Sequence, residues 1–253
     1  MKSRSRGALG PGNVRDRGGP ATLRVRESRR ARKVQLRLTA REGLEIVVPR
    51  GFDRSLLPGI LETHREWIGR MQGRAEKERR HLPAEFFEAL PDTVSLRAIG
   101  KIYEVVYRES TARGFRVQSF PERLLVEGPE KNTERIGTAL RGWLHAKAKA
   151  CLPDRLASAS RKSGLCYTAC SIRNQKTRWG SCSSGGNISL NCKLMFLPSD
   201  LVHYVLTHEL CHTRQMNHSP AFWSLVERME PECRHLDRDL RAAWRMVPRW
   251  AEH

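Results

Sequence analysis

Three histidines and one glutamate in the last quarter of the chain have the types and spacing of a catalytic metal site. His212 lies four residues after His208, Glu209 directly follows His208, and His218 comes six residues after His212. Residues four apart on a helix share a face, so His208 and His212 can bind one metal ion while Glu209 projects beside them. A catalytic zinc takes three protein ligands and keeps one position for water, and we predict His218 as the third ligand. The pattern therefore predicts metal-assisted hydrolysis with Glu209 as general base.

The elements around these residues have to bring His218 back to the other two histidines. The same pattern also occurs on solvated helix faces, but here an apolar helix is expected to begin at 198–200 and to carry it. We expect a turn at Met216-Asn217, with Asn217 in the left-handed conformation, because an unbroken helix would carry His218 away. A second helix is expected over 220–229, capped by Ser219.

Further segments of the chain resemble one known family. They are Arg178-Trp179-Gly180-Ser181-Cys182, Asn187-Ile188-Ser189-Leu190-Asn191, Leu197-Pro198, the His208 motif and Asn217-His218-Ser219-Pro220-Ala221-Phe222-Trp223, with weaker matches at Arg29-Arg30-Ala31-Arg32-Lys33, Val47-Val48-Pro49 and Trp67-Ile68. In this order they resemble the YgjP-like metallopeptidase family, which is related to the SprT-like and WLM-domain zincin proteases. The likeness extends over about 23–244.

The resemblance implies a small zincin fold with one zinc ion per chain. It implies His208, His212 and His218 as the ligands and Glu209 as the base. The spacing from His208 to His218 equals that of the metzincins, but Gln215 stands where those proteins use glycine for the turn. We therefore expect a turn of a different construction.

The N-terminal region is expected to be rich in strands. Alternating apolar and basic residues over 23–37 predict one strand, 44–48 predicts a second, and a helix over 55–80 is expected to pack on them. After a linker over 82–91, four short strands are expected in a meander, over 93–98, 101–107, 115–118 and 123–127.

The C-terminal region is expected to hold the catalytic domain. A long helix over 130–163, kinked or divided at Pro153, should pack behind the helix that carries the histidines. Extended segments at 170–173, 178–182 and 187–192 should follow, with a turn at 183–186, and the strand beside the metal is where we expect peptide to bind. A last helix should begin at Glu232. The fold class expected is α+β, with a disordered basic tail (1–22), a β-rich region (23–128) and a zincin-like metallopeptidase domain (129–253).

Three groups of residues leave alternatives open. Arg178, Asn191 and His203 could each donate to the oxyanion of the reaction, and sequence does not choose among them. His235, Asp237 and Asp239 could support a ligand histidine, or could form a solvated face. Cys166, Cys170, Cys182 and Cys192 could converge on a second metal ion, although their spacing lacks C-x-x-C knuckles and favours reduced, buried thiols.

The charge of the chain indicates an anionic partner. The net charge is +19 with a pI near 10.4, and residues 1–80 hold 21 Lys and Arg against 9 Asp and Glu. This basic N-terminal region suggests binding of DNA or RNA, with salt-sensitive binding lost when residues 1–41 are removed. No apolar run is long enough for a membrane span or a signal peptide, so a cytoplasmic protein is expected. The sequence does not indicate an oligomeric state.

The function predicted is a zinc metallopeptidase that hydrolyses peptide bonds, acting on proteins associated with nucleic acid. One alternative is a metal-dependent nucleotide pyrophosphohydrolase, although no glycine-rich phosphate loop supports it. Another is a non-catalytic basic nucleic-acid-binding protein with a structural zinc. Glu209 argues against the latter, because a structural site closes with a fourth ligand and needs no base.

Overall fold

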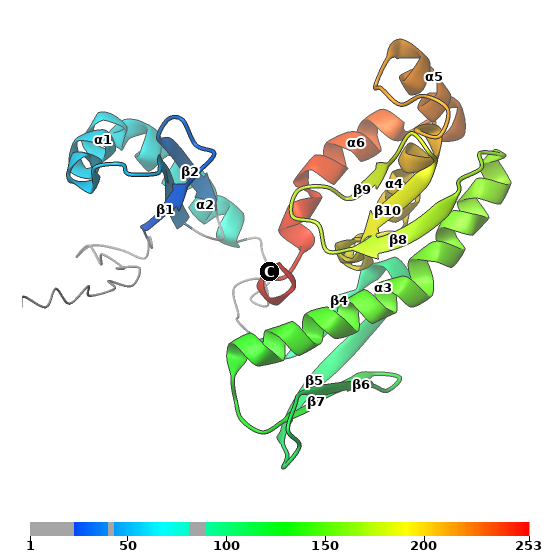
Figure 1. Ribbon diagram of the computed structural model, residues 1–253, viewed down its shortest axis with the longest axis horizontal. Helices are drawn as coiled ribbons and strands as arrows, with labels where there is room; N and C mark the ends of the chain where they lie inside the picture. Colours follow the sequence, from blue (N-terminus) through cyan, green and yellow to red (C-terminus); the bar gives the residue numbers. More distant parts are fainter. Residues whose placement is uncertain (1–22, 40–42, 81–89, 253) are drawn as a thin grey trace, which may run out of the picture. The chain divides into compact units, whose positions relative to one another are not determined.

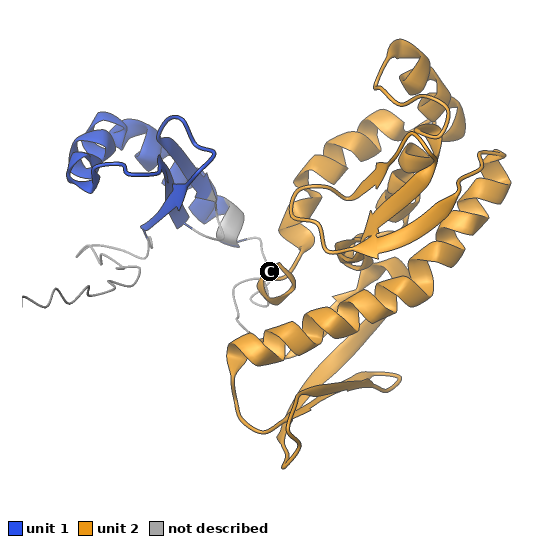
Figure 2. Cartoon of the chain, in the orientation of Figure 1, with its two compact units in different colours: residues 1–83 blue, residues 84–253 orange. Residues whose placement is uncertain are grey.

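The chain forms two compact units, residues 1–83 and 84–253 (Figure 2). The computed structural model describes residues 23–39, 43–80 and 90–252 (Figure 1). The basic tail expected at 1–22 and most of the expected linker therefore lie outside the described residues. None of the described helices combines the length and apolar character needed to cross a membrane.

The first unit contains a three-stranded sheet in the order β1-β3-β2. The central strand pairs in parallel with β1 and antiparallel with β2, so the single strand predicted over 23–37 is two strands. The most apolar of the three strands takes the middle position, where a neighbouring strand pairs with each of its edges. Its side chains Ile46, Val47 and Val48 are buried. The strands are β1 (Arg24–Ser28), β2 (Gln35–Thr39) and β3 (Gly43–Pro49).

The helical part of the first unit is divided where the sequence predicted one helix over 55–80. A short 3₁₀ turn begins after Asp53, whose side chain accepts from the backbone N–H of Ser55 at 2.9 Å. The following helix ends at His64, whose dihedral angles (φ −104°, ψ 13°) leave the helical range, and a longer helix then packs on β2 as expected. The elements are η1 (Arg54–Leu56), α1 (Leu57–Thr63) and α2 (Arg65–Arg80).

The second unit opens with a four-stranded sheet in the order β4-β5-β7-β6, so the predicted meander is wrong. The hairpin of β6 and β7 folds back so that β7 pairs in parallel with β5. The more apolar strand takes the central place: Leu124, Leu125 and Val126 of β7 are buried, whereas β6 lies at the edge. The strands are β4 (Thr93–Leu96), β5 (Lys101–Glu109), β6 (Arg116–Ser119) and β7 (Arg123–Gly128).

The long helix α3 (Thr133–Ser163) joins this sheet to the rest of the second unit. It begins at Asn132, whose side chain accepts from the N–H of Arg135, and it continues through Pro153 without a break. The buried residues of α3 share one core with β4, β5 and β7 and with the helix that carries the histidines. For that reason the unit boundary lies near residue 83 and differs from the boundary expected between 128 and 129.

A second three-stranded sheet stands beside the histidine helix. Its order is β8-β10-β9, with β10 parallel to β8 and antiparallel to β9, so β9 forms one edge. Gly186, with φ of 72°, makes the turn predicted between β9 and β10. The strands are β8 (Ala169–Arg173), β9 (Gly180–Cys182) and β10 (Asn187–Asn191).

Helices complete the second unit. The central one, α4, packs against α3, α5, α6 and β9, and most of its side chains are buried. This arrangement confirms the expected packing of the long helix against the helix that carries the histidines. The elements are η3 (Arg97–Ile99), η4 (Cys192–Phe196), α4 (Ser199–Cys211), α5 (Pro220–Met229), α6 (Cys233–Ala242), η5 (Ala243–Met246) and η6 (Arg249–Ala251).

Candidate metal centre

The C-terminal end of α4 carries two of the predicted ligands. His208 lies in the last turn of the helix and His212 is the residue at its C-cap. Their Nε2 atoms are 3.2 Å apart, as the i, i+4 spacing predicts. Leu201, Val205 and other apolar residues of the helix are buried, so the end of α4 is held firmly in the core.

His218 is brought back by a tight turn after α4. The backbone N–H groups of Arg214 and Gln215 both bond to the carbonyl of Cys211. No described residue other than glycine has a positive φ, so the left-handed conformation predicted for Asn217 is wrong. The turn is built from overlapping hydrogen bonds instead. It places Nε2 of His218 3.1 Å from Nε2 of His208.

Helix α5 fixes the far side of this turn. The hydroxyl of Ser219 accepts from the backbone N–H of Phe222 and caps the helix, as the sequence predicted. Phe222 is fully buried and stacks on the His212 ring, with centroids 4.4 Å apart and planes at 23°. Trp223 lies beside the His218 ring at 5.8 Å. The two aromatic residues therefore restrict the rotation of two of the three imidazoles.

The three imidazoles have the chemistry of a metal-binding group. Nδ1 of His212 is 2.9 Å from the carbonyl oxygen of Gln215; it donates there, which leaves the lone pair on Nε2. Burial, with smaller effects of His212 and His218, lowers the pKa of His208 to about 4, so its ring is neutral at pH 7. Two ligands at about 2.05 Å in tetrahedral geometry stand about 3.3 Å apart, close to the two distances measured. The donors fit a single zinc-sized ion.

The three histidines are the one such cluster among the described residues. Their ligand atoms lie within 4.8 Å of one another, and no other group of three or more His, Cys, Asp or Glu residues in that part of the chain could hold a metal. All seven cysteines are described, and they do not form the second metal site that the sequence left open.

Glu209 is a buried carboxyl group next to the cluster. Its side chain is 6% exposed, and Oε2 has no hydrogen-bond partner among the described residues. Burial raises its pKa to about 8, while the positive charge of Arg178 opposes the shift. Gly180 of β9 packs directly on this carboxylate, because a Cβ at that position would stand 2.6 Å from Oε1. The sequence motif contained this glycine but gave no reason for it.

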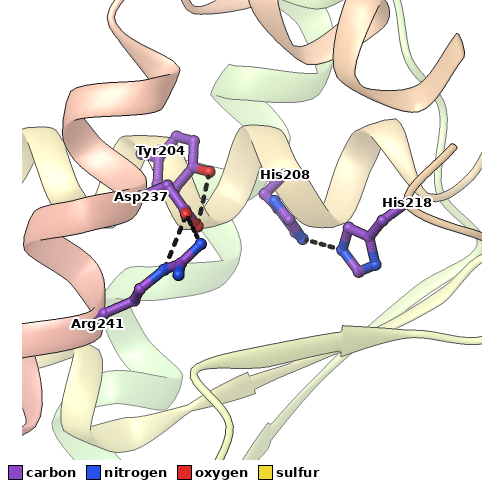
Figure 3. A network of polar contacts seen from close by, with 5 residues as sticks. All are labelled: Tyr204, His208, His218, Asp237 and Arg241. Atoms are coloured by element: carbon purple, nitrogen blue, oxygen red, sulfur yellow. Dashed lines mark hydrogen bonds and ion pairs between the residues drawn. The ribbon is translucent and has the colours of Figure 1, made fainter. Parts of the chain in front are cut away.

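Asp237, one of the residues that could support a ligand histidine, contacts Tyr204 and Arg241 (Figure 3). Its carboxylate accepts a long hydrogen bond of 3.5 Å from the buried hydroxyl of Tyr204 and a closer pair from Arg241. Tyr204 is one turn before His208 on α4, with ring centroids 5.9 Å apart. His235, by contrast, is exposed and pairs with Asp239 at 3.4 Å. Tyr204 was missed by the sequence analysis, since its contact comes from a different helix.

An α+β fold that gathers three imidazoles beside a buried carboxyl group has the architecture of a metallohydrolase. Comparison with known proteins defines the family: the model described as "YgjP-like, metallopeptidase domain" matches residues 32–243. The chain therefore belongs to the YgjP-like metallopeptidases, a class of hydrolases that act on peptide or protein substrates. The resemblance noted in the sequence and the expected α+β class are both confirmed.

Two solved structures are similar to part of the chain. One is the metallopeptidase zymogen abylysin of Pyrococcus abyssi, with 28% identity and a TM-score of 0.33, over 37% of this chain and 95% of that one. The other is the zymogen jannalysin of Methanocaldococcus jannaschii, with 19% identity and a TM-score of 0.33, over 37% of this chain and 96% of that one. The comparison with curated proteins gave no significant match.

Proposed function

We propose that this metallopeptidase uses one zinc ion held by His208, His212 and His218, with Glu209 as the general base. The observation that supports this best is the approach of three imidazole nitrogens, at 3.1 and 3.2 Å, beside a buried carboxyl group with an unpaired oxygen. A set of three imidazole ligands favours zinc or a neighbouring transition metal.

The zinc ion and Glu209 would have separate roles in the hydrolysis. Zinc, when bound, supplies a Lewis acid that lowers the pKa of a bound water to about 7 and polarises a carbonyl group. Glu209 accepts a proton from the attacking water and passes it to the leaving amine nitrogen as the C–N bond breaks. Burial raises the pKa of Glu209 to about 8 against the opposing charge of Arg178, and a pKa near neutrality suits a group that both takes and releases this proton. No covalent bond between the chain and the substrate is needed.

The free edge of β9 supports binding of an extended peptide. Asn191 and Ser183 bond across the hairpin to Trp179 and Asn187, so odd-numbered residues of β9 direct their backbone groups toward β10. The N–H and C=O groups of Gly180 and Cys182 therefore point along the other edge. A substrate strand that pairs there would lie beside Glu209, in the position that the sequence analysis assigned to peptide.

The experiment that tests this function compares wild type with Glu209→Gln. We expect one zinc per chain in both proteins by elemental analysis. We expect casein cleavage only in wild type, because the amide cannot accept a proton. A nucleotide hydrolysis assay beside it tests the pyrophosphohydrolase alternative. Absence of metal in carefully purified wild type, or full activity of the variant, would contradict the proposal.

We also propose that the substrates are proteins associated with nucleic acid. The support is the charge of the first unit, where β1, β2 and their connection expose a run of cations with few acidic neighbours. Arg26 pairs with Glu45 at 3.0 Å, and no other cation of this run forms an ion pair with a described residue. Lys and Arg in such a run can contact phosphates without reading sequence. The exposed residues are Arg24, Arg26, Arg29, Arg30, Arg32, Lys33 and Arg37. The cytoplasmic location stays a prediction.

A further inference from the structure

The segment that joins β8 to β9 is held by two buried polar side chains. Asn191 is fully buried, and its amide nitrogen donates to the carbonyl oxygens of Gln175 at 2.9 Å and Arg178 at 2.7 Å. The ammonium group of Lys193, which is 1% exposed, donates to the same Gln175 oxygen at 2.8 Å. Buried donors are costly to leave unpaired, so these bonds hold the backbone of 175–178 in one conformation.

The chain bends at Trp179, directly before β9 begins at Gly180. Trp179 points into the core and stacks on Trp244, with ring centroids 4.0 Å apart. Gly180 packs against the carboxylate of Glu209. Arg178 is two residues before Gly180, and its carbonyl is held by Asn191, so its backbone is fixed close to the glycine that covers Glu209.

Charge effects agree with this placement of Arg178 near Glu209. Burial raises the pKa of Glu209, and Arg178 is the charged group that opposes that shift. Cys182, which is two residues after Gly180 on the same face, has a pKa raised by burial and by the charge of Glu209. Arg178, Gly180 and Cys182 thus all lie near the carboxylate of Glu209.

The guanidinium of Arg178 is available for a further partner. Its side chain is exposed, and within the described ranges no carboxylate stands at ion-pair distance from it. The two other candidate oxyanion donors are less suitable. Asn191 donates both amide hydrogens to backbone carbonyls. The Nε2 atom of His203 already faces a carboxylate oxygen of Glu230, at 3.8 Å.

We propose that Arg178 donates hydrogen bonds to the carbonyl oxygen of the scissile peptide as that oxygen gains negative charge. This rests on the proposed function. The oxygen of water forms a bond to the carbonyl carbon, the C–N bond breaks, and the proton moves from water through Glu209 to the amine. Arg178 keeps all its protons throughout, because its guanidinium remains charged at every working pH. Its contribution is electrostatic, and it is stronger for the tetrahedral anion than for the planar substrate.

The test uses zinc-loaded Arg178→Ala and Arg178→Lys. Arg173→Ala, which removes an exposed cation at the other edge of the same sheet, is the matched control. Loss of one oxyanion donor costs about 10²–10³ in kcat, so we expect that loss in Arg178→Ala, with KM changed little. We expect partial recovery in Arg178→Lys and unchanged activity in the control. Zinc content should be equal in all proteins.

Binding provides a readout that does not depend on turnover. The probes are inorganic phosphate and a phosphinic peptide that copies the casein bond cleaved fastest, both measured by calorimetry. We expect Arg178→Ala to bind each probe at least about tenfold more weakly than wild type and the control. Equal affinities would overturn the proposal. So would a rise in KM alone that disappears for peptides with an amidated C-terminus, since Arg178 would then bind a terminal carboxylate. A wild type without zinc or peptidase activity would instead contradict the proposed function.

Discussion

At the scale of single residues, the proposed base, Glu209, depends on a neighbour that has no side chain. Glu209 is buried against the backbone of β9, and the contact leaves no room for a methyl group at Gly180. The pKa of Glu209 is raised to about 8 by that burial, so the environment that holds the base also determines its basicity. A substitution at Gly180 should therefore lower catalytic activity without lowering the zinc content.

Substitution Gly180→Ala should displace the carboxylate of Glu209 and lower kcat by at least about tenfold. Overpacking of this kind costs about 1–3 kcal/mol of stability. The three histidines are untouched, so zinc content should remain at the wild-type value. Activity assays, elemental analysis and urea unfolding check these outcomes.

Gly142→Ala is the matched control for this glycine. Gly142 is exposed within α3, and a Cβ there would contact nothing within 4 Å. It should raise stability by about 0.5–1 kcal/mol, because alanine favours helix, and should leave kcat unchanged. An active Gly180→Ala protein would show that the carboxylate can move without loss of function.

At the scale of elements, the site is assembled from the ends of α4, α5 and β9. Helix α4 supplies two imidazoles and the carboxylate, the capped start of α5 fixes the third imidazole, and β9 closes over the base. The β8–β9 segment is positioned by Asn191, at the end of β10, through two hydrogen bonds to backbone carbonyls. Its amide belongs to the support of the site and does not face the substrate.

Asn191→Ala should therefore weaken both stability and catalysis. Two carbonyl oxygens lose a buried donor, which costs about 1–3 kcal/mol, and the freed segment no longer holds Arg178 in place. Asn187→Ala, an exposed position on the same strand, should change stability by less than about 0.5 kcal/mol. Urea unfolding and steady-state kinetics on both variants make the comparison. Full activity in a destabilised Asn191→Ala protein would show that Asn191 stabilises the fold without contributing to catalysis.

At the scale of the whole molecule, the run of exposed cations and the candidate peptidase site belong to different compact units. The exposed cations of β1 and β2 lie in the first unit, and the candidate metal centre lies entirely in the second. Removal of residues 1–41 would delete two of the three strands of the first sheet, so surface substitutions give a cleaner test of nucleic-acid binding.

Replacing Arg29, Arg30, Arg32 and Lys33 together by Gln should weaken binding of single-stranded DNA. Each phosphate contact contributes about 0.7 to the slope of log K against log salt, so the slope should fall by up to about 3. Four exposed cations of the second unit, replaced in the same way, should leave the slope unchanged; they are Lys149, Arg161, Lys162 and Arg173. Binding that is indifferent to salt in the wild type would contradict the nucleic-acid proposal.

Much of the site could be predicted because it is encoded locally. The i, i+4 spacing of His208 and His212, the Ser219 cap and the extent of α5 follow from short-range geometry, and the structure agrees with each. The predicted conformation of Asn217 was wrong, because overlapping backbone bonds can end a helix without a left-handed residue. Two other predictions were wrong for a related reason, because the periodicity of apolar residues does not locate a break within an element. They are the single strand over 23–37 and the single helix over 55–80.

The sequence alone determined the family, the helix that carries the histidines, and which side chains could hold a metal. Tertiary structure determined the strand order β4-β5-β7-β6, the contact of Gly180 with Glu209, and the burial of Asn191. These features depend on segments that are distant in sequence and meet only when the core packs. Local patterns report on residues within a turn or two of one another. Contacts across the fold are set by which apolar faces can be buried together.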